Sequence, residues 1–320
     1  MWNLRYAVVS GVLIAILVGA NQTKAQETPL AAKWWPSEWG PDDERGAANR
    51  LTPAKVLRAV QLIRDGKVYE LGHVYEPGMP MLSGRHYSLT MLGSPTGVVA
   101  GPNPAVWFDS MVTGELGQVG TQFDGLGHVG VRVGDRDLFY NGFDRATFAR
   151  ARGLRKLGVE KVGPIVTRGV LIDVAAYKGV ARLAPGSVIT PDDLQGALNR
   201  QAVDISEGDV VLIRTGYGAL WMKDNATYAE RYPGIGMSAA QWLATRRVVL
   251  VGADNLGVNV QPDGEVPVHQ YLLTRQGIYL IENMNLEQLS AERVYEFAFA
   301  FVPLKLKGAE GSPGNAIAIR

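Results

Sequence analysis

Four short apolar runs stand out in the second half of the chain. They are rich in β-branched residues and bounded by Gly, Asp or Asn, a pattern typical of strands that are buried on both faces. These runs span residues 168–174, 208–216, 247–255 and 277–283. A tail over residues 294–308 alternates apolar with small or polar residues and predicts one or two further strands.

Segments of helical periodicity precede or separate these runs. Thr52 and Pro53 are typical of a helix start, and apolar residues then recur at helical spacing until Gly66. Thr190 and Pro191 begin a second predicted helix. Its first turn carries two acidic residues, which suit the positive end of the helix dipole.

A third, shorter helix is expected over residues 237–247, with Ser238 at its N-cap. Helices that alternate with buried strands predict an α/β domain. Because no internal repeat or low-complexity tract divides the chain, we expect a single domain whose β-sheet is flanked by helices.

Polar residues follow the C-terminal ends of several predicted strands. Examples are Thr215, Asp254, Asn255, Glu282 and Asn283. For one strand alone, turn chemistry explains such residues. Together they favour a ligand-binding edge, because ligands of open α/β sheets bind at the carboxyl ends of the strands. A segment rich in Gly and Pro, residues 93–110, is expected to form a loop that sets specificity.

The composition is that of a globular protein and narrows the function classes. Of the 320 residues, 47% are hydrophobic and 20% are charged, and 32 basic side chains nearly balance 31 acidic ones. This balance argues against a nucleic-acid partner, because such binders carry a basic excess. The chain contains no cysteine, so disulfides, thiolate nucleophiles and cysteine zinc sites are excluded.

The first 25 residues have the pattern of a secretory signal peptide. Arg5 precedes an apolar run over residues 7–20, and small residues up to Ala25 fit a cleavage site. We therefore expect residues 1–25 to be removed and residues 26–320 to form an exported domain, periplasmic or secreted. No later run of comparable length occurs, so no stable membrane insertion is expected after cleavage. An uncleaved anchor is the alternative interpretation.

Several catalytic motifs are missing from the sequence. There is no G-x-S-x-G, no G-x-G-x-x-G between a strand and a helix, and no H-E-x-x-H. The remaining candidates offer oxygen and imidazole groups, which indicate a hard-metal or acid/base site. They are Gln118, Gln122, Asp124, His128, His269 and Glu282.

The stretch GQVGTQFDGLGH, residues 117–128, resembles the signature H-x-G-T-H-x-D-x-x-x-H of the cyclase family. These are metal-dependent hydrolases that include bacterial kynurenine formamidase and isatin hydrolase. Four residues match the signature in place: Gly120, Thr121, Asp124 and His128. Glutamines occupy its first two histidine positions: Gln118 and Gln122. Residues 38–56 and 267–289 also resemble family segments, so the resemblance runs from Trp39 to Leu289.

The resemblance implies a mixed β-sheet flanked by helices, of the swivelling β/β/α type. It implies hydrolysis of an amide, lactone or ester bond in a small cyclic or aromatic substrate. A divalent ion, manganese or zinc, would be held by Gln118, Gln122 and Asp124. His128 would act as general base and then as acid, while His269 and Glu282 would bind a second metal or orient the substrate. The family also implies a homo-oligomer, a dimer or larger.

Other residues of these segments have expected supporting roles. Gly120 is expected to let the backbone turn so that positions 118, 122 and 124 converge, and Thr121 to hold that turn through its hydroxyl. His73 is expected to be structural or to contact substrate. His86 is expected to lie in a loop over the pocket.

The two glutamines change the expected metal chemistry, because an amide oxygen is a weaker zinc ligand than an imidazole nitrogen. Three outcomes stay open. The site holds a harder ion such as manganese, magnesium or calcium; the metal shifts toward Asp124, His128, His269 and Glu282; or no catalytic metal binds. Two other functions also stay open: a metal-independent lyase or dehydratase that uses His128 and Glu282, and a non-catalytic periplasmic protein that binds a small molecule.

Overall fold

The computed structural model describes residues 33–93, 96–98, 101–261 and 267–320. The predicted signal peptide, residues 1–25, lies outside the described residues. Within the described ranges, no helix is long and apolar enough to cross a membrane.

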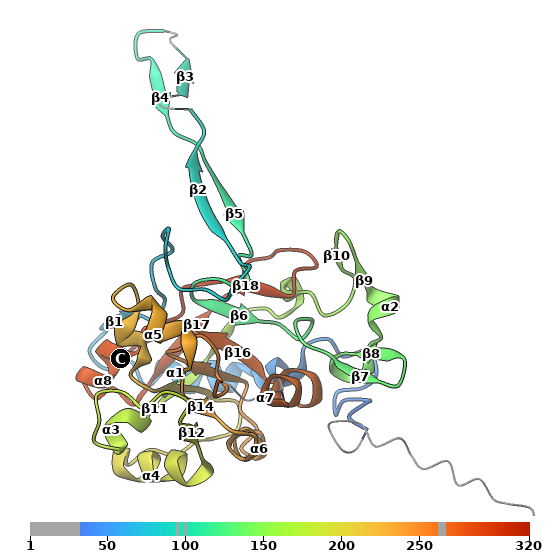
Figure 1. The fold of residues 1–320 in the computed structure, drawn as a ribbon, viewed down its shortest axis with the longest axis vertical. Helices are drawn as coiled ribbons and strands as arrows, with labels where there is room; N and C mark the ends of the chain where they lie inside the picture. Colours follow the sequence, from blue (N-terminus) through green and yellow to red (C-terminus); the bar gives the residue numbers. More distant parts are fainter. Residues whose placement is uncertain (1–32, 94–95, 99–100, 262–266) are drawn as a thin grey trace, which may run out of the picture.

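A nine-stranded mixed sheet forms the centre of the molecule (Figure 1). Its strand order is β1-β19-β17-β11-β13-β15-β16-β6-β18. Four neighbouring central strands run parallel, and they correspond to the four apolar runs of the sequence. They are β11 (Ile165–Asp173), β13 (Val210–Arg214), β15 (Leu250–Ala253) and β16 (Tyr279–Glu282). The prediction of an α/β fold with a mixed sheet is confirmed.

Antiparallel strands extend the sheet on both sides of this parallel group. On one side β17 pairs with β11, and on the other β6 pairs with β16. Within the tail 294–308, one of the expected strands forms, namely β17. The outer strands are β1 (Val68–Glu70), β6 (Gln122–Asp124), β17 (Glu296–Phe301), β18 (Gly311–Pro313) and β19 (Ile317–Ile319).

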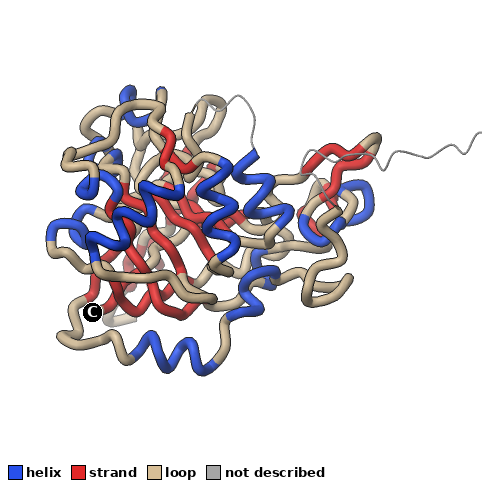
Figure 2. Tube along the Cα trace, turned by 90° about the horizontal axis from the view of Figure 1, so that it is seen from below, coloured by secondary structure: helices blue, strands red, loops and turns tan. Residues whose placement is uncertain are grey.

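Helices lie over the sheet and connect its parallel strands (Figure 2). α1 contacts β11 and β17, whereas α4 contacts β11 and α6. In α4, Thr190 and Asp193 exchange side-chain-to-backbone hydrogen bonds, a capping box that explains where the helix begins. The helices are α1 (Pro53–Val60), α2 (Arg145–Phe148), α3 (Val174–Tyr177), α4 (Pro191–Gln201), α5 (Asn225–Glu230), α6 (Met237–Thr245), α7 (Pro267–His269) and α8 (Glu287–Ala291).

Two helix boundaries differ from the sequence-based prediction. The N-cap of α6 is Gly236, so Ser238 lies inside the helix and does not cap it. α1 ends at Val60 and does not continue to Gly66. Leu57 and Val60 are exposed, so the apolar periodicity of this segment does not mark a fully buried face.

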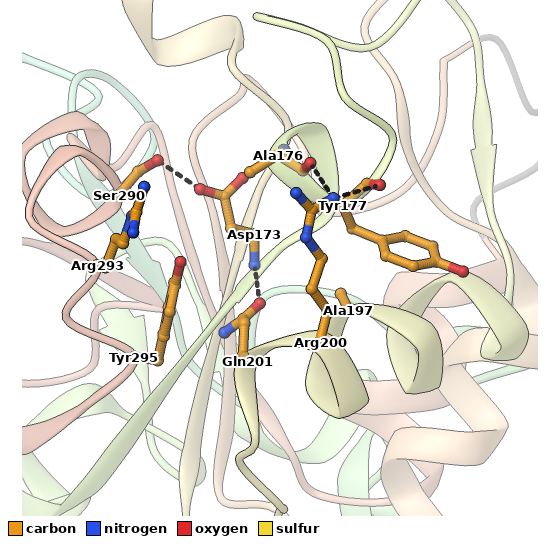
Figure 3. A pocket seen from close by; sticks show the side chains of 9 residues that line it. All are labelled: Asp173, Ala176, Tyr177, Ala197, Arg200, Gln201, Ser290, Arg293 and Tyr295. Atoms are coloured by element: carbon orange, nitrogen blue, oxygen red, sulfur yellow. Dashed lines mark hydrogen bonds between the residues drawn. The ribbon is translucent and has the colours of Figure 1, made fainter.

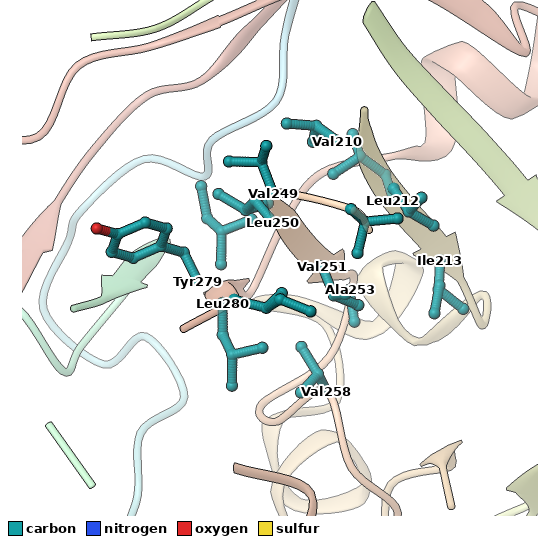
Figure 4. Close-up of a cluster of buried hydrophobic side chains, with 14 of the residues drawn as sticks. Val210, Leu212, Ile213, Val249, Leu250, Val251, Ala253, Val258, Tyr279 and Leu280 are labelled. Atoms are coloured by element: carbon teal, nitrogen blue, oxygen red, sulfur yellow. The ribbon is translucent and has the colours of Figure 1, made fainter. Parts of the chain in front are cut away.

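The main hydrophobic core is built on the parallel strands. Figure 4 shows side chains of β13, β15 and β16 packed together, among them Val210, Val251 and Leu280. All three are fully buried. Removal of apolar surface from water contributes about 25 cal/mol per Å². The core therefore gives a rigid base to the polar residues at the strand ends.

Residues 86–114 form a hairpin that projects away from the body (Figure 1), which we call the arm. Near the body β2 (Tyr87–Met91) pairs with β5 (Ser110–Gly114), and further out β3 (Thr96–Val98) pairs with β4 (Ala105–Trp107). The sequence predicted a specificity loop over residues 93–110. The described part of that segment instead forms the outer half of the arm.

Short hairpins and helical turns make up most of the remaining connections. Trp34 packs against Val131 and Leu138, and this contact anchors the start of the described chain. The short strands are β7 (Val131–Val133), β8 (Arg136–Leu138), β9 (Ala149–Arg150), β10 (Gly153–Leu154), β12 (Val188–Ile189) and β14 (Gly234–Ile235). The 3₁₀ turns are η1 (Gly46–Arg50), η2 (Tyr140–Gly142), η3 (Val159–Lys161) and η4 (Tyr217–Leu220).

Candidate metal centre

The alternation of β6 places two polar side chains on one face of the sheet. Gln122 and Asp124 are two residues apart and point the same way. Phe123 points to the opposite face and stacks on Tyr279, with 5.1 Å between the ring centroids. In the register with β16, Gln122 lies opposite Glu282. Backbone pairing therefore fixes Gln122, Asp124 and Glu282 relative to one another.

Asp124, His269 and Glu282 form a buried cluster that can hold a metal ion. One ligand atom from each lies within 4.8 Å of the other two. His269 Nε2 is 3.1 Å from Glu282 Oε1 and 3.7 Å from Asp124 Oδ2. Among the residues that the structure describes, no other group of three His, Cys, Asp or Glu side chains has this spacing.

His269 reaches the cluster from an unusual helical segment. It ends α7, and the chain continues as the π-helix η5 (Gln270–Arg275). π-Helical turns are rare and frequently occur at functional sites. The structure thus brings His269 to Glu282, the pair that the sequence analysis placed together.

Burial and charge shift the pKa values of Asp124 and Glu282 in opposite directions. Burial raises the pKa of Asp124 above its usual value. Burial also opposes ionisation of Glu282, but the hydrogen bond and charge of His269 lower the pKa of that carboxyl. The backbone N–H of Val258 also donates to Glu282 Oε1, at 2.8 Å. Glu282 is therefore the more readily ionised acid of the pair.

Two buried oxygen atoms of the site accept no hydrogen bond from the described residues: Asp124 Oδ2 and Gln122 Oε1. A buried oxygen without a donor is unfavourable by about 1–3 kcal/mol, and a cation would compensate for this cost. Two carboxylates and one imidazole are suitable ligands for zinc or manganese. The residues present therefore fit the divalent ion that the family resemblance implies.

Gln118 directs its amide nitrogen toward the centre. Arg85 donates to Gln118 Oε1 at 3.0 Å and to the main-chain oxygen of Gln118 at 2.5 Å. A guanidinium has only donors, so the amide oxygen of Gln118 faces Arg85. Its Nε2 then donates to Asp124 Oδ1 at 2.9 Å. This geometry favours a supporting role for Gln118 over the ligand role expected from the sequence.

His128 lies beside the cluster and is partly exposed, at 22% of its side chain. Its Nδ1 is 3.2 Å from Gln118 Nε2. An amide nitrogen donates and does not accept, so Nδ1 is the acceptor and the proton of the neutral ring lies on Nε2. This Nε2 is 3.9 Å from Asp124 Oδ1. With Nδ1 engaged, Nε2 is the ring atom left to interact with a substrate.

A tight turn leads into β6. Gly120 has φ +62°, and a Cβ there would lie 2.7 Å from the ring of Tyr75. The Thr121 hydroxyl donates to the main-chain oxygen of Asn283 at 2.6 Å and accepts from the His73 N–H at 2.8 Å. Asn283 Nδ2 in turn donates to the oxygen of Gly120 at 2.7 Å. The turn has the construction expected for Gly120 and Thr121.

Two further residues of the site, Arg85 and Asn283, were not predicted as site residues, although Asn283 stands out in the sequence as a strand-end residue. Arg85 is 33 positions before Gln118 and carries no local motif, so only the fold reveals their contact. Asn283 did have a signal, since it directly follows a buried strand. Its φ of +54° is a conformation that Asn adopts more readily than most residues.

A cavity, about 380 Å³ in volume, lies near the C-terminal end of β11 (Figure 3). Asp173 lines it, but its carboxylate already has several partners. It accepts hydrogen bonds from Arg214 at 3.1 Å, from the backbone N–H of Ala176 at 2.9 Å and from the Ser290 hydroxyl. These bonds give Asp173 a structural role, and the cavity is distinct from the cluster around Asp124.

Several known proteins resemble this chain in sequence. Residues 69–260 match the Cyclase family model, described as "Putative cyclase". Cyclase-like protein 3 from Oryza sativa subsp. japonica is 31% identical over 154 residues, which are 47% of this chain and 53% of the rice protein. Kynurenine formamidase from Polaromonas naphthalenivorans is 36% identical over 150 residues, 46% of this chain and 60% of that enzyme. These two alignments thus cover somewhat more than half of each relative's length.

Solved structures extend the similarity to nearly the whole chain. A crystal structure of a novel cyclase is 34% identical with a TM-score of 0.80, and the match covers 88% of this chain and 98% of that one. Isatin hydrolase A from Ralstonia solanacearum has the same fold, with 20% identity, a TM-score of 0.58 and coverage of 84% and 98%. The family model, matched over more than half of the residues, decides the assignment: this chain belongs to the Cyclase family.

Proposed function

We propose that the chain is a metal-dependent hydrolase that cleaves an amide, lactone or ester bond in a small cyclic or aromatic molecule. The observation that carries this proposal is the buried cluster of Asp124, His269 and Glu282 with His128 beside it. Similarity to a protein named kynurenine formamidase supports an amide among these bonds. Isatin hydrolase A supports only the fold at its level of identity.

Asp124, His269 and Glu282 would hold the divalent ion, which we propose to be zinc or manganese. Gln122 would add a neutral ligand, because its buried Oε1 accepts no hydrogen bond from the described residues. When bound, such an ion supplies Lewis acidity, which polarises a carbonyl and lowers the pKa of water. Of the two carboxyls Glu282 ionises more readily, so it is the proton of Asp124 that metal binding would displace.

His128 is the residue proposed to contact the substrate at Nε2, which carries the ring proton in this tautomer and so donates a hydrogen bond, whereas the general-base role expected from the resemblance would need Nε2 unprotonated. Gln118 holds the other ring nitrogen and so fixes the orientation of the imidazole. Arg85 acts through Gln118, because its hydrogen bond to Oε1 sets which end of the Gln118 amide faces His128.

The test combines elemental analysis of the purified protein with turnover of an amide, lactone and ester panel, with and without chelator. Asp124→Asn should lose both metal and turnover, whereas His128→Gln should keep the metal and lose turnover. Asp135→Asn and His86→Gln are matched controls, because both residues are exposed and outside the cluster. Both controls should behave as the unmodified protein.

The outcomes separate the alternative functions. Full turnover by both Asp124→Asn and His128→Gln would contradict the proposed roles of Asp124 as a metal ligand and of His128 in the reaction. Turnover that resists chelator but disappears in His128→Gln and Glu282→Gln would indicate a metal-independent lyase or dehydratase. Tight binding of a small molecule without turnover or bound metal would indicate a non-catalytic binding protein.

A further inference from the structure

The cavity near the C-terminal end of β11, about 380 Å³ in volume, shares part of its wall with another cavity of about 210 Å³. Gln201, Arg293 and Tyr295 line both, and we call the two together the basic groove. Sites for small molecules typically have about 300–1,000 Å³, so the first cavity alone is large enough for one. The arginines that line the basic groove are Arg64, Arg200, Arg293 and Arg320.

Two carboxylates also line the basic groove, and each is already bonded to an arginine outside it. Asp173 is only 2% exposed and accepts from Arg214 at 3.1 Å. Glu296 accepts from Arg168 at 2.7 Å. Neither Arg214 nor Arg168 belongs to the lining. The lining therefore presents more positive than negative charge to whatever enters.

Three of the four arginines have no carboxylate partner among the described residues, and only Arg320 has one, Asp65 at 4.0 Å. Arg200 is held by the main chain instead. Its Nη1 donates to the oxygens of Ala176 and Tyr177 at 3.0 and 3.1 Å, the bonds drawn in Figure 3. A guanidinium carries five N–H donors, so Arg200 is fixed in orientation and has donors left for a ligand.

Arg293 occupies a backbone position that normally favours glycine. It follows α8, and its N–H donates to the oxygen of Ser290 at 3.0 Å. The next N–H, of Val294, donates to the oxygen of Leu289 at 2.9 Å. These two bonds form a Schellman motif, in which the left-handed residue is usually Gly. Arg293 is that residue, with φ +55°.

The side chain of Arg293 does not offset the cost of this conformation within the chain. A left-handed backbone is unfavourable for a residue with a Cβ. The guanidinium of Arg293 nevertheless makes no hydrogen bond or ion pair with any residue that the structure describes. Residues held in unfavourable backbone conformations are concentrated at functional sites. A partner for this guanidinium is therefore expected from outside the chain.

We propose that the basic groove binds a small organic anion with two or more negative charges, of the phosphate ester or dicarboxylate type. Guanidinium groups bind phosphate and carboxylate oxygens in the same bidentate manner, so the two types share one chemistry. Arg293 and Arg200 lie on either side of Asp173 (Figure 3), so two anionic groups can each meet an arginine. The groove is distinct from the metal centre, and the inference does not depend on the hydrolase activity.

The experiment measures binding to the full chain by isothermal titration calorimetry. The probes are inorganic phosphate, glycerol phosphate and succinate, with glycerol as the uncharged comparison. At least one anion should bind at millimolar concentration or below, and added salt should weaken it. The order of the three affinities then shows whether phosphates or carboxylates are preferred.

Charge-neutralising variants test which arginines are responsible. Arg293→Gln and Arg200→Gln should each weaken binding about 10-fold or more, as expected when a charge-assisted hydrogen bond is lost. Arg152→Gln is the matched control, because Arg152 is exposed, lies outside the groove and loses the same charge. It should bind like the unmodified chain.

Arg293→Gly separates binding from a role in the fold. Glycine suits the left-handed position, so this variant should have a higher Tm without ligand and still bind about 10-fold more weakly. This comparison also covers the case in which Arg200→Gln does not fold, as judged by circular dichroism. Asp124→Asn should keep full affinity, because the groove is distinct from the metal centre.

Four results would overturn the proposal. They are no binding of any of the three anions, equal weakening in Arg152→Gln, unchanged affinity in Arg293→Gly, and loss of binding in Asp124→Asn. The last result would place the anion at the metal centre. Failure of the hydrolase assays alone would leave the expected binding to the groove unchanged, so the two proposals are tested separately.

Discussion

Arg85 Nη2 donates to Gln118 Oε1 at 3.0 Å, and this contact turns the amide N–H of Gln118 toward Asp124 and His128. Without it, both ends of the amide would be free to face the centre. The contact thus sets the hydrogen-bonding partners of a carboxylate and an imidazole at once.

Replacement of Arg85 should therefore reduce turnover without unfolding the protein. Arg85→Met removes all donors, and we expect kcat to fall about 10-fold or more, the size usually seen when a partner of a metal or catalytic residue is lost. Arg85→Lys keeps the charge but cannot bind both the main-chain oxygen and Oε1 of Gln118 in the same plane. Its kcat should therefore lie between that of the unmodified protein and that of Arg85→Met. Steady-state kinetics with circular dichroism checks this, and unchanged kcat in Arg85→Met would refute the role.

Gln122→His should strengthen zinc binding. Gln122 faces Glu282 across the β6–β16 pair, and its Oε1 has no donor among the described residues, so an imidazole nitrogen there can face the ion. We expect affinity for zinc to rise about 10-fold or more, since imidazole is the stronger zinc ligand. Competition with a chromophoric chelator measures the change.

Gln118→His is the comparison for that prediction. It should not strengthen zinc binding, because it leaves the guanidinium of Arg85 without the acceptor Oε1 and removes a donor to Asp124. Equal gains in the two variants would show that both glutamine positions face the ion, as expected from the sequence.

The fold was predictable where local pattern and tertiary structure agree. The four parallel strands are continuous β-branched runs, and such runs are stable only when both faces are buried. The arm was missed because Gly and Pro in residues 93–110 favoured a loop. Yet Leu89 and Met91 alternate with Ser88 and Thr90, which is a strand signal.

The site was predictable in its residue types and less so in its contacts. Asp124, His269 and Glu282 carry ligand chemistry that sequence can show. The direction of the Gln118 amide depends on Arg85, which nothing local marks. The orientation of a side chain that is set by a partner distant in sequence depends on the tertiary structure. Residue types alone therefore could not decide whether Gln118 is a metal ligand or a supporting residue.

His73 should make stability depend on pH. Burial lowers the pKa of His73 to about 4, and its ring stacks on Trp221 with 4.3 Å between centroids. Between that value and the unfolded value of 6.5, the unfolded chain binds the proton more readily, so stability falls as pH falls through this window. The loss should be about 2 kcal/mol between roughly pH 7 and pH 5.

Urea unfolding at the two pH values measures this effect. In His73→Asn the dependence should shrink by the same amount, because the replaced side chain does not titrate there. If the variant keeps the full dependence, other groups are responsible and His73 is not the cause.

Gly120→Ala should destabilise the turn before β6. The substitution places a Cβ in left-handed backbone and against the ring of Tyr75, so we expect a loss of about 2–4 kcal/mol in the free energy of unfolding. Gly66→Ala is the matched control, with φ +70° and nothing within 4 Å of the added Cβ, and should lose only about 1 kcal/mol. Equal losses in urea unfolding would mean that the contact with Tyr75 is unimportant.

The expected export of the chain predicts where its mature N-terminus lies. If residues 1–25 are a cleaved signal peptide, protein recovered from the periplasm or medium should begin at Gln26. Mass spectrometry of the intact chain checks this. A membrane-bound product that keeps residue 1 would support the uncleaved anchor.

The backbone ladder of β6 with β16 and β18 has a consequence for how the centre is assembled. Hydrogen bonds between main chains set the spacing of Gln122, Asp124 and Glu282, and no ion is needed to form them. A slip of β6 by one residue would turn Asp124 into the core and present Phe123 in its place. Correct strand register is thus a precondition for the centre: only a correctly paired chain brings Gln122, Asp124 and Glu282 together on one face of the sheet.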